Sequence, residues 1–146
     1  MWNSIIRMGS SVQPGRIGIV LDMKMKPQIK LIAIDDRSEW ESALSRCAPV
    51  DIYHSWEYHR FSVFQSPTVL PYLFFFELDD QAVSLPFLLK PIDDLDWMTD
   101  SSGYYDGTSV YGYPGIVGQV TLPETEQNTF FSIFFQSLED TLKDLK

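Results

Sequence analysis

Cysteine and basic residues are both scarce in this sequence of 146 residues. Cys47 is the only cysteine, which excludes an intrachain disulfide framework and is typical of a reducing compartment. There are 11 basic and 20 acidic residues, so the formal net charge is −9. Nucleic-acid backbones and anionic membrane surfaces select basic proteins, so we expect neither to be a general partner.

Long hydrophobic runs are absent as well. The longest purely apolar stretches, such as residues 73–76, are far shorter than the roughly 20 residues that a membrane-spanning helix requires. The first residues do not form a secretory signal, because residues 8–16 contain Gly, Ser, Gln and Pro where the apolar core of a signal should be. We therefore expect no membrane span and a cytoplasmic location.

The composition is that of a globular protein. Hydrophobic residues make up 45% of the chain, charged residues 21% and aromatic residues 14%, and the length fits one domain. Residues 1–27 differ from the rest, because turn signals interrupt the one short apolar stretch that they contain. We interpret them as an N-terminal extension of uncertain structure, followed by one domain over residues 28–146.

The periodic part of the chain begins with a predicted strand over residues 29–34, where apolar and β-branched residues are concentrated. Asp36 is the predicted N-cap of a helix, and Glu39 stands three residues later, as in a capping box. A single apolar stripe follows at helical spacing: Trp40, Ala43, Leu44 and Cys47. A second helix is predicted over residues 56–65, with Ser55 as its cap and Pro67 beyond its end.

Two predicted strands, residues 72–78 and 82–89, flank a loop of hairpin length. Pro86 lacks a backbone donor, so we expect the second strand to be an edge at that point or to carry a bulge. A final helix is predicted from about residue 126 to 145, with Thr125 as its cap. Its apolar residues form a wide face: Phe131, Phe134, Phe135, Leu138, Leu142 and Leu145.

Residues of the types that bind metals lack the spacing of a metal site. His54 and His59 are five residues apart, whereas a zinc-binding helix places its histidines at i and i+4. The aspartates of residues 93–100 lack the glycine and the terminal glutamate of a calcium loop. We therefore predict no metal site, and the sequence also lacks the motifs of a nucleophile elbow and a Walker loop.

Polar groups are concentrated in residues 106–115, which we interpret as an exposed loop. Tyrosine rings such as Tyr111 and Tyr113 can stack on a ligand or donate hydrogen bonds to it. The Asp106 carboxylate can accept a proton from an amine or orient it. The alternative is a rigid structural loop with buried rings, and the spacing alone does not separate the two interpretations.

The order of residues in this loop, Asp-x-Thr-Ser-x-Tyr-Gly-Tyr-x-Gly, resembles a segment of the FemAB-like branch of the GNAT acyltransferase superfamily. Residues 51–59 resemble the early D-x-Y-x-x-x-E-Y segment of that family. Residues 72–78 and 85–92 resemble its first pair of strands. The resemblance extends from about residue 30 to the end of the sequence.

This resemblance implies an α+β fold with a twisted, mostly antiparallel sheet flanked by helices. It implies transfer of an acyl or aminoacyl group to an amine of a small molecule or cell-wall precursor. The donor would be an acyl-CoA or an aminoacyl-tRNA, and no cofactor is expected in the chain itself. The polar groups of residues 106–115 coincide with the family-like segment, and on both grounds we assign Asp106 and Tyr111 to catalysis. The residues assigned to substrate binding are Glu57, Tyr58, Ser109 and Tyr113.

The sequence departs from the superfamily in one respect. The loop of the type Arg/Gln-x-x-Gly-x-Gly/Ala that holds the donor's pyrophosphate is absent. We therefore expect the acceptor-side, N-terminal half of such a domain, inactive in isolation. The alternative is a non-catalytic binding or interaction module, or a degenerate fragment of the enzyme. The final helix would bind either a missing C-terminal half or a second copy of the chain.

Overall fold

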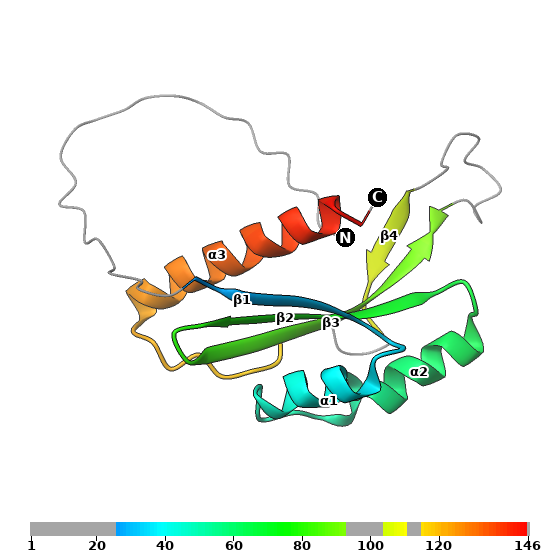
Figure 1. Cartoon of the computed structure of the whole chain (residues 1–146), viewed down its shortest axis with the longest axis horizontal. Helices are drawn as coiled ribbons and strands as arrows, with labels where there is room; N and C mark the ends of the chain where they lie inside the picture. The colour runs from blue at the N-terminus through cyan, green and yellow to red at the C-terminus, as the bar shows by residue number, and fades with distance from the viewer. Residues whose placement is uncertain (1–25, 93–103, 111–114, 146) are drawn as a thin grey trace.

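The computed structural model describes residues 26–92, 104–110 and 115–145 (Figure 1). The elements follow in the order β1 (Gln28–Ala33), α1 (Arg37–Ser45), η1 (Ile52–His54), α2 (Trp56–Gln65), β2 (Leu70–Leu78), β3 (Gln81–Pro91), β4 (Tyr105–Thr108) and α3 (Glu124–Lys143). The expected α+β class is confirmed. Residues 1–25 of the predicted extension, together with Tyr111 and Tyr113, lie outside the described residues.

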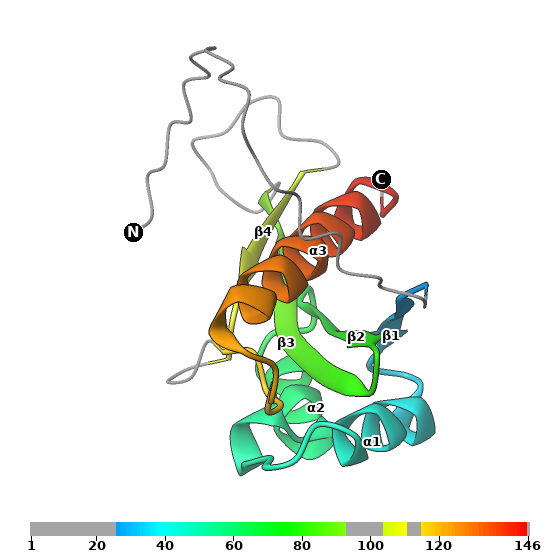
Figure 2. The same ribbon diagram turned by 90° about the vertical axis from the view of Figure 1, so that its left-hand side faces the viewer.

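The four strands form one antiparallel sheet in the order β1-β2-β3-β4. Helices α1 and α2 lie on one face of this sheet, and α3 crosses the other face (Figures 1 and 2). The predicted hairpin is β2–β3, closed by Asp79 and Asp80 with φ of 48° and 64°. Two such positive values belong to the turn whose twist matches that of paired strands.

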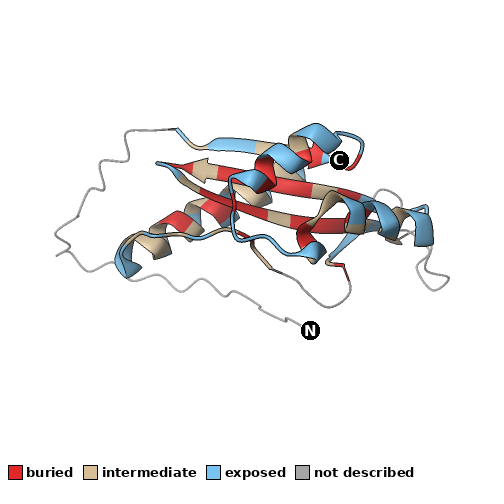
Figure 3. Cartoon of the chain, turned by 90° about the horizontal axis from the view of Figure 1, so that it is seen from below, coloured by how far each residue is buried: buried red, intermediate tan, exposed pale blue. Residues whose placement is uncertain are grey.

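The layer of α1 and α2 is held on the sheet by the apolar stripe that the sequence predicts. Trp40, Ala43, Leu44 and Cys47 are all buried, together with Ile32, Ile34, Leu73, Phe75, Ala82 and Val117. The predicted cap of α1 is confirmed, because Asp36 Oδ1 accepts a hydrogen bond of 3.1 Å from the Glu39 amide. The central strands β2 and β3 are covered on both faces, so residues 73–76 and 82–84 are buried in succession (Figure 3).

The other face of the sheet packs on α3 through phenylalanine rings. Phe134 lies edge-to-face on Phe74 and Phe76, at centroid distances of 5.4 and 5.7 Å. Phe130 packs on Phe76 in the same way at 5.2 Å. The predicted apolar face is therefore wrong at two positions. Phe130, which it left out, is buried, and Phe135, which it included, is 54% exposed.

The start of α3 also differs from the prediction. The helix begins at Glu124, and Thr125 lies within it instead of capping it. The Pro123 carbonyl accepts the amide hydrogens of Glu126 and Gln127, both at 2.9 Å. Proline has a restricted backbone that suits the position just before a helix. Its effect at Pro123 is larger than that of a side-chain cap at Thr125, so the helix begins two residues earlier than predicted.

Pro86 lies in β3, an interior strand whose register with β2 runs without a bulge from Gln81 to Leu89. On the other side of β3, Ser84 exchanges two hydrogen bonds of 2.8 Å with Val117, and the pairing with β4 starts at Leu88. Successive residues direct their N–H groups to opposite sides of a strand, so the Pro86 nitrogen faces the interval between these two pairings. At Pro86 this side of β3 is locally an edge of the sheet. The missing N–H donor therefore leaves no hydrogen bond between strands unmade.

Candidate functional site

Part of the predicted loop is a strand. β4 (Tyr105–Thr108) pairs with the end of β3, with Asp106 opposite Lys90 and Gly107 opposite Leu89. Aspartate and glycine disfavour strands, so the sequence pattern indicated a loop. The backbone groups at the end of β3 form hydrogen bonds with residues 105–108. These bonds outweigh the weak local preference against a strand.

The pleat of β4 divides the candidate residues between the two faces of the sheet. Residues that are directly paired share a face. Leu88 packs in the cluster on the α2 side, so Asp106 and Lys90, two residues along, belong to that side. Leu89 packs against the α3 side, and Gly107 lies opposite it. Ser109 continues the α3 side because it lies an odd number of residues from Asp106.

A cavity of about 300 Å³ lies on the α3 side, and we call it the α3 cavity. Its wall is formed by β3, by residues 107–109 and by the C-terminal half of α3: Leu85, Pro86, Phe87, Gly107, Thr108, Ser109, Leu138 and Leu142. The lining is almost entirely apolar, and Ser109 is the hydroxyl-bearing residue that the pleat directs to this side. Such a cavity suits a small ligand with an apolar body and one polar group.

Tyr58 lies on the opposite face of the sheet. Its ring packs edge-to-face on Tyr53, with centroids 5.1 Å apart. Both tyrosines pack on the buried cluster of Val69, Leu88 and Val110. The structure therefore brings Tyr58 to the end of the segment that contains Asp106, but away from Ser109.

Glu57 points toward α1. Its Oε1 accepts a hydrogen bond of 2.5 Å from Arg37 Nη2, and Arg37 Nε donates to Glu41 at 2.6 Å. The same guanidinium lies over the Trp56 ring, 4.6 Å from its centroid. Glu57 thus connects the two helices on their exposed surface, and the structure does not place it with Asp106.

Two buried groups with shifted titration lie elsewhere. Burial raises the pKa of Cys47, whose Sγ is 3.3 Å from Ser84 Oγ, so the sulfur stays a thiol. Burial lowers the pKa of His59, whose Nδ1 is 3.0 Å from the Ser55 carbonyl oxygen. The proton of this neutral ring lies on Nδ1, and Nε2 has no hydrogen-bond partner in the structure. Neither side chain lines the α3 cavity.

The apolar half of the α3 cavity was not predicted from the sequence. Leu138 and Leu142 belong to the predicted apolar face of the last helix, which indicated packing or a partner and not a cavity. The available signal is a size mismatch, because these leucines lie opposite the small residues Gly107, Thr108 and Ser109. This mismatch can be recognised only when residues 107–109 are known to lie against the end of α3.

Comparison of the chain with models of protein families found no match, and neither did searches of curated proteins and of solved structures. Within residues 26–92, 104–110 and 115–145, no three histidine, cysteine, aspartate or glutamate side chains are grouped so that they would hold a metal ion. None of the helices in these segments has the length and apolar character to cross a membrane.

Proposed function

We propose that this chain is the acceptor-side portion of a FemAB-like GNAT acyltransferase, which transfers an acyl or aminoacyl group to an amine. The α3 cavity would hold the apolar part of a substrate. One observation supports this most directly: residues 107–109, which belong to the motif with the family resemblance, form a wall of that cavity.

In this proposal the cavity positions the substrate and the edge of β4 supplies polar groups. The Ser109 hydroxyl donates a hydrogen bond to the polar group of a ligand whose aliphatic part contacts Leu138 and Leu142. Asp106 lies on the other face, so it reaches an acceptor amine only around the exposed β4 edge. Its proposed task there is to orient that amine and accept its proton.

Binding of simple probes tests the cavity. We expect hexylamine or hexanoate, added to isotopically labelled protein, to shift the amide signals of residues 107–109 and of Leu138 and Leu142. Leu142→Trp fills the space between helix and strand, and should abolish those shifts. Phe135→Trp is the matched control, because it changes the exposed side of the same helix and should leave binding intact. Absence of any shift with the unmodified chain would remove the proposal's main support.

A non-catalytic binding module is the second candidate. It is favoured by the fact that none of the side chains lining the α3 cavity titrates near neutral pH. Mass spectrometry of a mixture of the protein, acetyl-CoA and hexylamine separates the two functions. Formation of N-hexylacetamide above the uncatalysed rate indicates an acyltransferase, whereas binding at the cavity without amide formation indicates the module.

A further inference from the structure

Helix α2 packs one face on its own domain and exposes two large aromatic rings on the other. Its inner face carries the fully buried His59, which packs on Trp40 with ring centroids 5.0 Å apart. Its outer face carries Phe61, 53% exposed, and Phe64, 84% exposed. Phe64 is the most exposed large hydrophobic residue of the described chain. A helix that buries one face in its own domain normally presents polar residues on the other.

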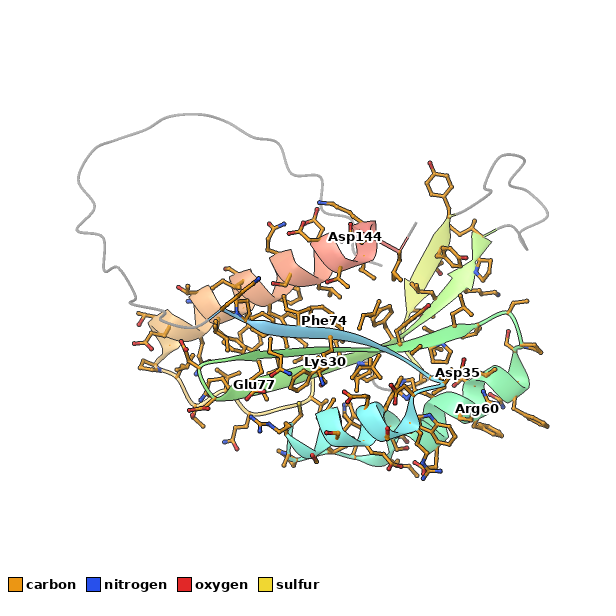
Figure 4. The ribbon with its side chains drawn as sticks, in the orientation of Figure 1. Lys30, Asp35, Arg60, Phe74, Glu77 and Asp144 are labelled. Atoms are coloured by element: carbon orange, nitrogen blue, oxygen red, sulfur yellow. The ribbon has the colours of Figure 1, made fainter. Side chains whose placement is uncertain are left out.

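Two opposite charges flank the exposed ring of Phe64. Successive residues of a helix are about 100° apart, so Arg60 lies about 40° to one side of Phe64 and Glu57 about 20° to the other. The Arg60 and Glu57 side chains are 52% and 60% exposed. The closest ion pair of Arg60 is a long one, 3.9 Å from Nη1 to Asp35 Oδ1 (Figure 4).

We infer that this outer face of α2 binds a second copy of the same chain. A two-fold axis parallel to α2 would pair the α2 helices of the two copies in parallel. The side of the outer face that carries Arg60 would then lie against the side that carries Glu57 in the other copy. Arg60 of each copy then meets the partner's Glu57, and the two Phe64 rings meet at the axis. Glu57 also accepts a hydrogen bond from Arg37 of its own chain, so its carboxylate would lie between two guanidinium groups. Because acid, base and aromatic residues all lie on one face, this face is complementary to itself.

The expected dimer is weak and depends on concentration. A shallow groove of about 480 Å³ marks this face, lined by Trp56, Glu57, Arg60, Phe61, Val63 and Phe64. One ten-residue helix offers less contact area than the roughly 800 Å² per partner of a standard interface. The net charge of −9 on each copy also opposes association, although salt at physiological strength screens it beyond about 8 Å.

Sedimentation velocity over a hundredfold range of protein concentration tests this inference. We expect the mass of the unmodified chain to rise from monomer toward dimer and to stop there. Phe64→Asp and Arg60→Glu should both remain monomeric over the same range, with unchanged circular dichroism because both positions are exposed. Phe135→Asp, which places the same charge on the exposed side of α3, should dimerise like the unmodified chain.

Three results would overturn the inference. One is a monomer at every concentration. Another is a dimer that survives Phe64→Asp but is lost in Phe135→Asp, which would move the interface to α3. The third is open-ended growth beyond a dimer, which would exclude a closed two-fold contact. The Leu142→Trp variant should dimerise normally, so the result is independent of the proposed α3 cavity.

Discussion

At the scale of single residues, Gly118 is the position where the backbone conformation requires glycine. Its φ is +127°, and an added Cβ would lie 2.4 Å from the Ala82 carbonyl oxygen. We expect Gly118→Ala to lower the free energy of unfolding by about 1–3 kcal/mol, through backbone strain and displacement of the strand beside it. Urea denaturation measures this change.

Gly107 is the matched control for that measurement. At this position an added Cβ would be 4.0 Å from Leu89 Cδ2, an ordinary contact. Gly107→Ala should be neutral or stabilise the fold by up to about 1 kcal/mol, because it restricts the unfolded chain. Equal losses in both variants would show that the close approach at Gly118 does not determine stability.

His59 should make stability depend on pH. Burial lowers its pKa, although the bond to Ser55 partly opposes the shift. The unfolded chain binds a proton near pH 6.5, whereas the folded chain binds it only at a lower pH. The free energy of unfolding therefore falls as the pH decreases below about 6.5, until the folded state is protonated too.

His59→Phe keeps an aromatic ring beside Trp40 and removes the titrating group. The slope of unfolding free energy against pH, measured between about pH 5 and 7 by denaturant titration, should become flatter in this variant. The loss of the Ser55 hydrogen bond shifts the whole curve and does not alter its slope. Parallel curves for the two proteins would contradict this role of His59.

At the scale of elements, α3 is held by one side of its phenylalanine-rich surface. Phe134 is fully buried against Phe74 and Phe76, so Phe134→Ala should cost about 3–5 kcal/mol of unfolding free energy. Phe135→Ala removes an equal ring from the exposed side, and should cost less than about 1 kcal/mol. Thermal unfolding followed by circular dichroism distinguishes the two, and similar costs would mean that Phe135 is covered in solution.

The elements that carry strong local signals could be predicted from the sequence. Helix α2 begins and ends as predicted, because Ser55 accepts the Tyr58 amide and Pro67 prevents continuation of the helix. The β2–β3 hairpin was predicted because a short loop, residues 79–81, separates two apolar runs. In the structure Gln81 belongs to β3, so the turn has two residues.

The candidate site could be predicted only in part. Residues 106–109 contain Asp, Gly, Thr and Ser, and their strand conformation depends on the end of β3 rather than on local preference. Without that strand the pleat is unknown, so the sequence could not show that Asp106 and Ser109 belong to opposite faces. The family resemblance assigned Glu57 and Tyr58 together to substrate binding, although neighbouring residues of a helix point about 100° apart.

At the scale of the whole molecule, net charge limits the choice of ligand. The formal charge of −9 and the missing phosphate loop both disfavour a polyanionic donor. We expect titration calorimetry of this chain with acetyl-CoA to detect no binding in the micromolar range. A micromolar dissociation constant, about 8 kcal/mol of binding free energy, would reveal a donor site that the motif analysis missed.

The β2–β3 hairpin also bears on the order of folding. It joins the two central strands through two residues, so its contacts are the most local of the sheet and require little loop closure. The helices on both faces of the sheet then pack on the hairpin, which has already formed. We expect substitutions at Phe76 and Val83, which are paired in the hairpin, to slow folding, and those in β4 to speed unfolding. Stopped-flow kinetics would reveal the hairpin as the nucleus from which this chain acquires its structure.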